Sequence, residues 1–156
     1  MIDTQIWIYS KKKPIRTKFE SETDYLKTME LHQKAEKFLK SFTGEVIIYF
    51  SIQQIGELFH TLAFRGVKIP VNEANEFINI LINSDNIIVI PYSTDDLIKA
   101  MILSARSKIH IWDYLCVIPL INHISKIYTV DSHFKDKTFI DLGISIENPL
   151  EVWQTL

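Results

Sequence analysis

The sequence predicts an α/β fold, a three-layer α/β/α arrangement around a central parallel sheet of four to five strands. The first observation behind this prediction is that short β-rich runs, at 45–50, 86–92 and 127–130, alternate with amphipathic stretches of helical length. The second is that these runs are continuously apolar, which is typical of strands buried on both faces. The third is that 156 residues, with 47% hydrophobic and 23% charged residues and no Pro/Gly/Ser-rich linker, fit a single domain spanning 1–156.

The chain opens with an apolar, β-rich run at 2–9, which we expect to be the first strand and its exit. Ser21 followed by Asp24 resembles a capping box and predicts the start of a helix that runs to about residue 42. Gly44 suits the end of this helix. The apolar residues at helical spacing within it are Leu26, Met29, Phe38 and Phe42.

The run 45–50 predicts a second buried strand. Ser51 with Gln54 caps the following helix, which we expect to end before Gly66, and 71–83 predicts another amphipathic helix. The residues expected to form one face of the capped helix are Ile52, Ile55, Phe59 and Leu62.

The third strand is expected at 86–92, and Ser93 with Asp96 opens a helix to about residue 108. A further helix carries Asp113 near its start. Its apolar residues, at helical spacing, are Leu115, Ile118, Ile121 and Ile124.

The β-branched run 127–130 predicts a buried strand that delivers Asp131 at its carboxyl end, where open α/β sheets bind ligands. A weaker strand is expected at 144–147. Asn148 and Pro149 then resemble an N-cap and the first turn of a helix.

Four acids fall at element ends or on helix faces next to the predicted sheet: Asp3, Glu57, Asp113 and Asp131. Each alone is explained as a helix cap or a solvated charge. Together at one sheet edge they would repel by about 4 kcal/mol per pair at 4 Å and an effective dielectric near 20. A hard cation relieves this repulsion, and carboxylate oxygens suit Mg²⁺ or Mn²⁺. We therefore expect a metal site.

Five segments, in order along almost the whole chain, resemble the successive motifs of PIN domains, the family that includes the VapC-type toxins of toxin–antitoxin pairs. They are MIDTQIWIY, SIQQIGELF, IHIWDYLCVIPL, IYTVD and IENPLEVW. The resemblance implies a PIN-like fold and a Mg²⁺- or Mn²⁺-dependent ribonuclease. It also implies that the four acids are the catalytic and metal-binding residues, supported by the hydroxyl groups of Thr4, Ser51 and Thr129. Two departures from the family are Gln5, where asparagine is usual, and a first strand that is shorter than usual before Asp3. The further acid that some relatives carry just after the Asp131 position is also missing.

The expected chemistry is hydrolysis of an RNA phosphodiester bond by water that a carboxylate-held cation activates. Because water attacks rather than the ribose 2′-OH, the expected products carry a 5′-phosphate and a 3′-hydroxyl. No protein nucleophile is required.

Composition and motifs exclude several other classes of protein. The net charge of −2 gives no global basic field, so a nucleic acid would have to be bound locally. The five histidines and one cysteine form no zinc motif, and the four glycines form no phosphate-binding loop. With no predicted signal peptide, membrane span or disulfide, we expect a cytoplasmic protein.

Three features are left open by the sequence. The basic run of Lys11, Lys12, Lys13, Arg16 and Lys18 is either a solvated loop or a contact for RNA phosphates. His133, the histidine nearest the acids, is interpreted as a surface residue or a substrate contact. Trp112 packs in the core or stacks on a base.

The partners expected are an RNA substrate and an antitoxin protein. The helices between Ser51 and Ser84 carry more bulky residues than one face against a sheet needs, which predicts an antitoxin surface or a homodimer interface. These residues are Phe59, Leu62, Phe64, Phe77, Ile80 and Leu81. The alternative function is a catalytically weak or inactive PIN-like module that binds RNA or acts as a scaffold. A phosphoryl-accepting regulatory domain ranks last, because it would need paired acids after the first strand.

Overall fold

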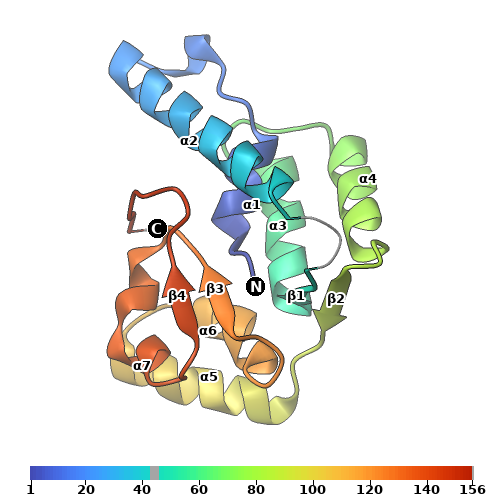
Figure 1. Ribbon diagram of the computed structural model, residues 1–156, viewed down its shortest axis with the longest axis vertical. Helices are drawn as coiled ribbons and strands as arrows, with labels where there is room; N and C mark the ends of the chain where they lie inside the picture. The colour runs from blue at the N-terminus through green and yellow to red at the C-terminus, as the bar shows by residue number, and fades with distance from the viewer. Residues whose placement is uncertain (43–45, 156) are drawn as a thin grey trace.

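The computed structural model describes residues 1–42 and 46–155, which form a mixed α/β fold (Figure 1). The helices are α1 (Thr4–Lys11), α2 (Glu22–Lys40), α3 (Ile52–Phe64), α4 (Val71–Ile82), α5 (Thr94–Ser107), α6 (Ile111–Val117) and α7 (Lys137–Ile140). The strands are β1 (Ile48–Ser51), β2 (Ile87–Ile90), β3 (Lys126–Tyr128) and β4 (Ser145–Glu147). Short 3₁₀ turns lie at Arg16–Lys18, Ile118–Leu120 and Ser132–Lys135.

The strands form two parallel pairs. β1 pairs with β2 and β3 pairs with β4, and single parallel bridges add Ile2 to Tyr128 and Asp131 to Gln154. The predicted parallel pairing is therefore confirmed. The predicted continuous sheet of four to five strands is wrong for the part of the chain that the structure describes.

The side chains around Ile2 explain why the sheet is interrupted. The first residues pair with β3, since the Asp3 N–H donates to the Tyr128 carbonyl at 2.8 Å. On the opposite edge, the Ile2 carbonyl accepts from Gln54 Nε2 at 2.6 Å and from Trp7 Nε1 at 3.2 Å. These two side chains satisfy the backbone group that would otherwise pair with a neighbouring strand.

The predicted first strand at 2–9 is wrong beyond this bridge, because the chain turns into α1 immediately after Asp3. The apolar residues of this run are still buried, but on a helix: Ile6, Trp7 and Ile8 all lie in the core. A short apolar run suits a buried helix as well as a buried strand, so the pattern alone does not decide between them.

The capped helices are confirmed. Ser21, Ser51 and Ser93 each accept a hydrogen bond from the backbone N–H three residues later, and Ser93 forms a complete capping box with Asp96. The predicted helix at 71–83 is confirmed as α4. Gly44, the predicted end of α2, and Glu45, the predicted start of the second strand, lie outside the described residues.

Three further expectations need correction. The buried face of α3 consists of Gln54, Leu58, Leu62 and Ala63, while Ile52 is exposed. The helix carrying Asp113 ends at Val117 and continues as a 3₁₀ turn containing Pro119, which has no N–H for the helical ladder. After β4 the chain forms a turn rather than a helix, with the Leu150 N–H donating to Asn148 Oδ1 at 2.9 Å.

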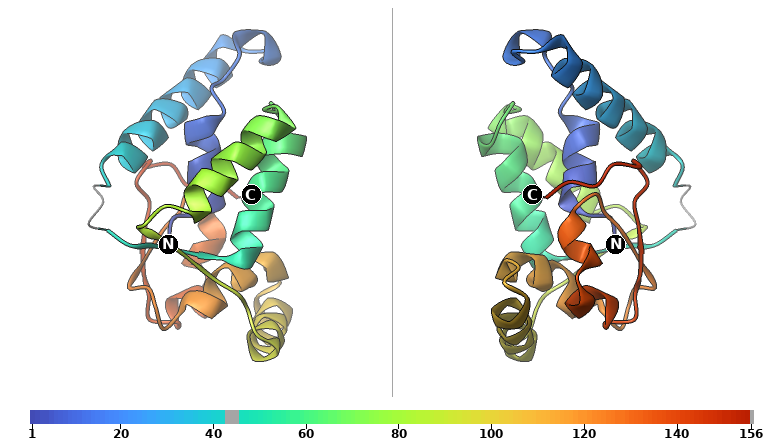
Figure 2. Two further views of the ribbon diagram at one scale, coloured as in Figure 1. Left: turned by 90° about the vertical axis from the view of Figure 1, so that its right-hand side faces the viewer. Right: turned by 90° about the vertical axis from the view of Figure 1, so that its left-hand side faces the viewer.

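The core consists of two clusters of buried side chains. One joins α1, α3, α4 and β1 with Val130 and Leu150, and the other joins α5, α6 and β3 with Phe134 and Phe139. In Figure 2, α2 and α5 lie at opposite ends of the molecule. None of the helices described is both long and apolar enough to span a membrane.

The predicted apolar surface of α3 and α4 is present only in part. Leu62 and Leu81 are buried, and Phe59 and Phe77 pack partly against the core. Phe64 and Ile80 remain exposed, at 47% and 62% of their surface.

Candidate functional site

Four elements bring the four acids together. Asp3 is the residue before α1, Glu57 lies within α3, Asp113 lies in the first turn of α6, and Asp131 follows β3. All four line one pocket of about 380 Å³, which we call the acid pocket. The convergence expected from the sequence is therefore found, while the catalytic and metal-binding roles of these residues remain predictions. The other residues of the acid pocket are Thr4, Gln5, Arg65, His110, Trp112, Cys116, His133 and Phe134.

Two threonine hydroxyls hold the acids in place. Thr129 Oγ1 donates to Asp3 Oδ2 at 2.6 Å and accepts from the Asp131 N–H at 2.9 Å, so one buried hydroxyl links two acids. Thr4 Oγ1 donates to Glu57 Oε2 at 3.1 Å. Ser51 instead caps α3, accepting from the Gln54 N–H at 3.1 Å, and so acts on Glu57 only through the helix that carries it.

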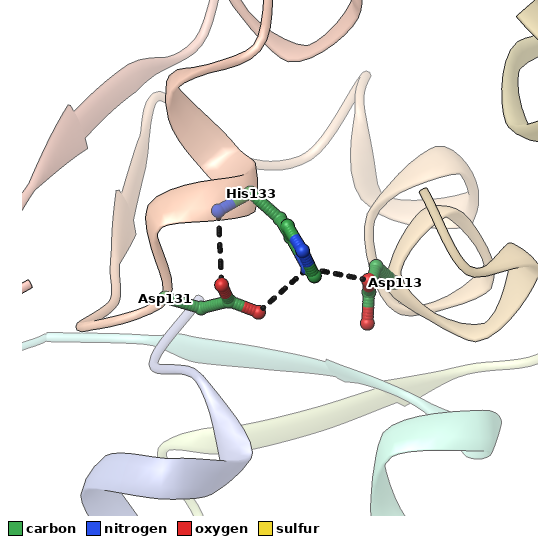
Figure 3. Close-up of side chains that lie close together, drawn as sticks. All are labelled: Asp113, Asp131 and His133. Carbon is green, nitrogen blue, oxygen red and sulfur yellow. Dashed lines mark hydrogen bonds and ion pairs between the residues drawn. The ribbon is translucent and has the colours of Figure 1, made fainter. Parts of the chain in front are cut away.

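His133 lies between two of the acids (Figure 3). Its Nδ1 atom is 3.4 Å from Asp131 Oδ2 and 3.6 Å from Asp113 Oδ2, and its backbone N–H donates to Asp131 Oδ1 at 2.9 Å. This Nδ1 atom is buried and makes no well-formed hydrogen bond within the described residues. The side chain of His133 is still 28% exposed, so it lies at the surface of the pocket with its Nδ1 atom covered, and a role as a substrate contact stays a prediction. Its place two residues after Asp131, in the turn that Asp131 caps, is the sequence signal that could have identified it.

The electrostatics of the acid pocket favour protonation of Asp3, Glu57 and Asp113 in the absence of a cation. Burial, followed by the charges of Glu57, Asp131 and Asp113, raises the pKa of Asp3 to about 7 against a lowering effect of the Thr129 hydrogen bond. Burial and the charge of Asp131 raise the pKa of Asp113 to about 6. Although Glu57 as a residue is exposed, burial of its carboxyl group raises its pKa as well.

These donors fit a divalent cation. One ligand atom from each of Asp113, Asp131 and His133 lies within 4.8 Å of the others, and Asp3 and Glu57 add carboxylates at the same pocket. A bound cation would replace repulsion among the acids with attraction, and an oxygen-rich set suits Mg²⁺ or Mn²⁺. The buried Nδ1 of His133 adds a nitrogen donor, which favours Mn²⁺ over Mg²⁺.

Three of the five basic residues in the run that begins at the end of α1 are engaged within the protein. Lys11 lies over the ring of Phe77 at 4.1 Å, Lys12 donates to backbone carbonyls at the end of α3, and Arg16 pairs with Glu22. The cationic side chain that lines the acid pocket is instead Arg65. Neither periodicity nor motif singles out Arg65 in the sequence, because it is simply the residue that ends a helix.

Comparison with known proteins identifies the fold. No family model matches the chain, and no curated protein matches it. Among solved structures, it is similar to a chain in the structure of FitAB bound to an IR36 DNA fragment, with a TM-score of 0.60 and 14% sequence identity. The match covers 98% of this chain and 96% of that chain. The similarity extends over both chains and supports a PIN-like fold.

Proposed function

We propose that this protein is a Mg²⁺- or Mn²⁺-dependent endoribonuclease that acts as the toxin of a toxin–antitoxin pair. The observation that carries the proposal is the convergence of Asp3, Glu57, Asp113 and Asp131 on one pocket within a PIN-like fold. The four acids come from four separate elements, so no single helix cap or exposed turn explains their grouping. The toxin role follows from the resemblance of the sequence motifs to the VapC-type toxins, and the similarity to FitAB supports the fold on which it rests.

In this proposal the carboxylates would hold the cation, and the threonine hydroxyls would orient two of the carboxylates. When bound, a divalent cation supplies Lewis-acid chemistry, activating water and stabilising the charge that develops on the phosphodiester. The four carboxylates would hold it, with His133 beside Asp113 and Asp131. The hydrogen bonds from Thr129 and Thr4 fix the orientation of Asp3 and Glu57 and favour their ionised forms.

The partner proposed is an antitoxin protein. The exposed side chains of Phe64 and Ile80 offer it an apolar contact at the α3–α4 side of the molecule. The same surface would serve a homodimer, and sedimentation of the purified chain with and without its antitoxin separates these two uses.

The test is cleavage of single-stranded RNA by the purified protein. We expect cleavage in Mg²⁺ or Mn²⁺, none in EDTA, and products with a 5′-phosphate. Asp113→Asn should abolish cleavage while leaving the fold intact or more stable, because it removes a ligand and also relieves repulsion.

The matched control is Asp96→Asn. Asp96 accepts hydrogen bonds from the Ser93 backbone and hydroxyl at the start of α5, so this variant should keep full activity and lose about 1 kcal/mol or less of stability. Full activity of Asp113→Asn would contradict the proposal that the acid pocket is the catalytic site. Binding of RNA without any cleavage would favour the alternative, an inactive PIN-like RNA-binding module.

A further inference from the structure

A second hollow adjoins the acid pocket. It has a volume of about 460 Å³ and shares the lining residues Glu57, Arg65 and Trp112 with the acid pocket. We call it the α3 groove, because its other residues lie on that helix: Gln53, Gly56, His60 and Thr61.

Arg65 is the cation at the junction of the two spaces. Its backbone is fixed at the end of α3, with its N–H donating to the Thr61 carbonyl at 3.3 Å and its own carbonyl accepting from Lys12. The guanidinium Nε donates to His60 Nε2 at 3.5 Å. Within the described residues no carboxylate oxygen lies within 4.0 Å of Arg65, although four acids line the adjoining pocket. An anchored guanidinium without a carboxylate partner is suited to bind a phosphate.

Trp112 supplies an aromatic surface at the same junction. Its side chain is 48% exposed, and the ring lies against that of His110 with centroids 5.9 Å apart. A large exposed ring beside a phosphate-binding cation is the arrangement on which unpaired bases stack.

Because Gly56 has no side chain, the wall of the groove at this position consists of backbone atoms alone. A glycine inside a helix costs about 0.5–1 kcal/mol relative to alanine. Apart from its chain neighbours and the backbone of its own helix, a Cβ at this position would meet no described atom within 4 Å, so packing against other parts of the protein does not explain the glycine. Its effect is to leave the groove open directly beside Glu57.

We infer that the α3 groove binds the single-stranded RNA next to the cleaved bond, with a phosphate on Arg65 and an unpaired base on Trp112. The inference takes its substrate class from the proposed function and adds the residues that hold the strand. It places the substrate along α3 rather than along the basic run after α1, whose Lys11, Lys12 and Arg16 are already engaged.

The experiment measures binding of a fluorescent single-stranded RNA of mixed sequence by the full chain carrying Asp113→Asn, which prevents cleavage. In this background Trp112→Ala should weaken binding about 5-fold to 100-fold. Arg65→Gln should lower the slope of log affinity against log salt by about 0.7, the value for one phosphate contact with a single strand. Gly56→Phe should fill the groove and weaken binding about 5-fold or more, the loss expected when one base can no longer stack.

Each variant has a matched control. Gly56→Ala adds only a Cβ, and should bind as its parent does. Trp153→Ala and Arg106→Gln change the same residue types outside both hollows and should leave the affinity and the salt slope unchanged. Circular dichroism of every variant establishes that it is folded before binding is compared.

The inference is wrong if folded Trp112→Ala binds RNA with unchanged affinity and folded Arg65→Gln shows an unchanged salt slope. This holds whatever the result of the nuclease assay. If wild type shows no metal-dependent cleavage but RNA binding still depends on Trp112 and Arg65, the ribonuclease proposal is wrong, while the inference that the α3 groove binds RNA is supported. If wild type cleaves RNA, the groove variants should raise KM much more than they lower kcat.

Discussion

At the scale of single residues, the carboxylates of the acid pocket are buried close together, and a bound positive charge would stabilise their ionised forms. Asp3 lies in a largely desolvated position with three other carboxylates nearby, and its pKa is about 7 rather than the ordinary 3.8. Between about pH 4 and pH 7 the folded protein therefore binds more protons at Asp3 than the unfolded chain does. The free energy of unfolding then falls as pH rises through this interval, and the stabilisation from protonation is lost above pH 7.

We predict that the metal-free protein in EDTA melts at a higher temperature at pH 5 than at pH 8. Asp3→Asn should raise the melting temperature at pH 8 by about 2 °C or more, since 1 kcal/mol corresponds to about 2–4 °C in a domain of this size. The same variant should change little at pH 5. Calorimetry at the two pH values measures this, with the exposed Asp141→Asn as control. An Asp3→Asn variant that is less stable at pH 8 would contradict the role assigned to burial of this charge.

The residues of the site divide into those a sequence can reveal and those it cannot. The four acids could be predicted because each falls at an element end or on a helix face next to the predicted sheet, and the carboxyl ends of parallel strands meet at one edge. Arg65 could not be predicted, and His133 could be identified only as the histidine nearest the acids in the sequence. Arg65 reaches the pocket from the end of α3, and His133 reaches it through a 3₁₀ turn, so neither position follows from periodicity.

At the scale of elements, the sequence predicts best the structures that depend on residues close together in the chain. The caps at Ser21, Ser51 and Ser93 mark helix starts because the side-chain acceptor and its N–H donor are only three residues apart. The run at 2–9 forms a helix where the sequence predicts a strand, because the outcome depends on contacts with Tyr128 and Gln54, which are distant in the chain.

Gln54 is the side chain that ties α3 to the first residues of the chain. We predict that Gln54→Leu, which keeps the volume but loses the hydrogen bond to the Ile2 carbonyl, lowers the free energy of unfolding by about 1–3 kcal/mol. Urea denaturation measures this, and the exposed Gln33→Leu on α2 should stay within about 0.5 kcal/mol of wild type. Wild-type stability in Gln54→Leu would mean that Trp7 alone satisfies this carbonyl.

At the scale of the whole molecule, the acid pocket lies where the two core clusters meet. Asp3 precedes α1 and Glu57 lies on α3, which belong to one cluster, while Asp113 lies on α6, which belongs to the other. Asp131 follows a segment shared by both, with Ile127 in the second cluster and Val130 in the first. A cation held by all four would therefore join the two halves, and its binding free energy would add to the stability of the complete fold.

We predict that Mg²⁺ or Mn²⁺ at about 100 times its dissociation constant stabilises the protein by about 2.7 kcal/mol, and so raises the melting temperature by about 5–11 °C. The rise should be larger at pH 8 than at pH 5, because protons compete with the cation for Asp3 and Asp113. Asp113→Asn should lose most of the rise although its metal-free form is at least as stable as wild type. KCl at equal ionic strength should give little change in either protein, since screening alone does not coordinate the acids. An equal rise in wild type and Asp113→Asn, or in MgCl₂ and KCl, would show that the cation binds elsewhere and that the two core clusters meet without a metal between them.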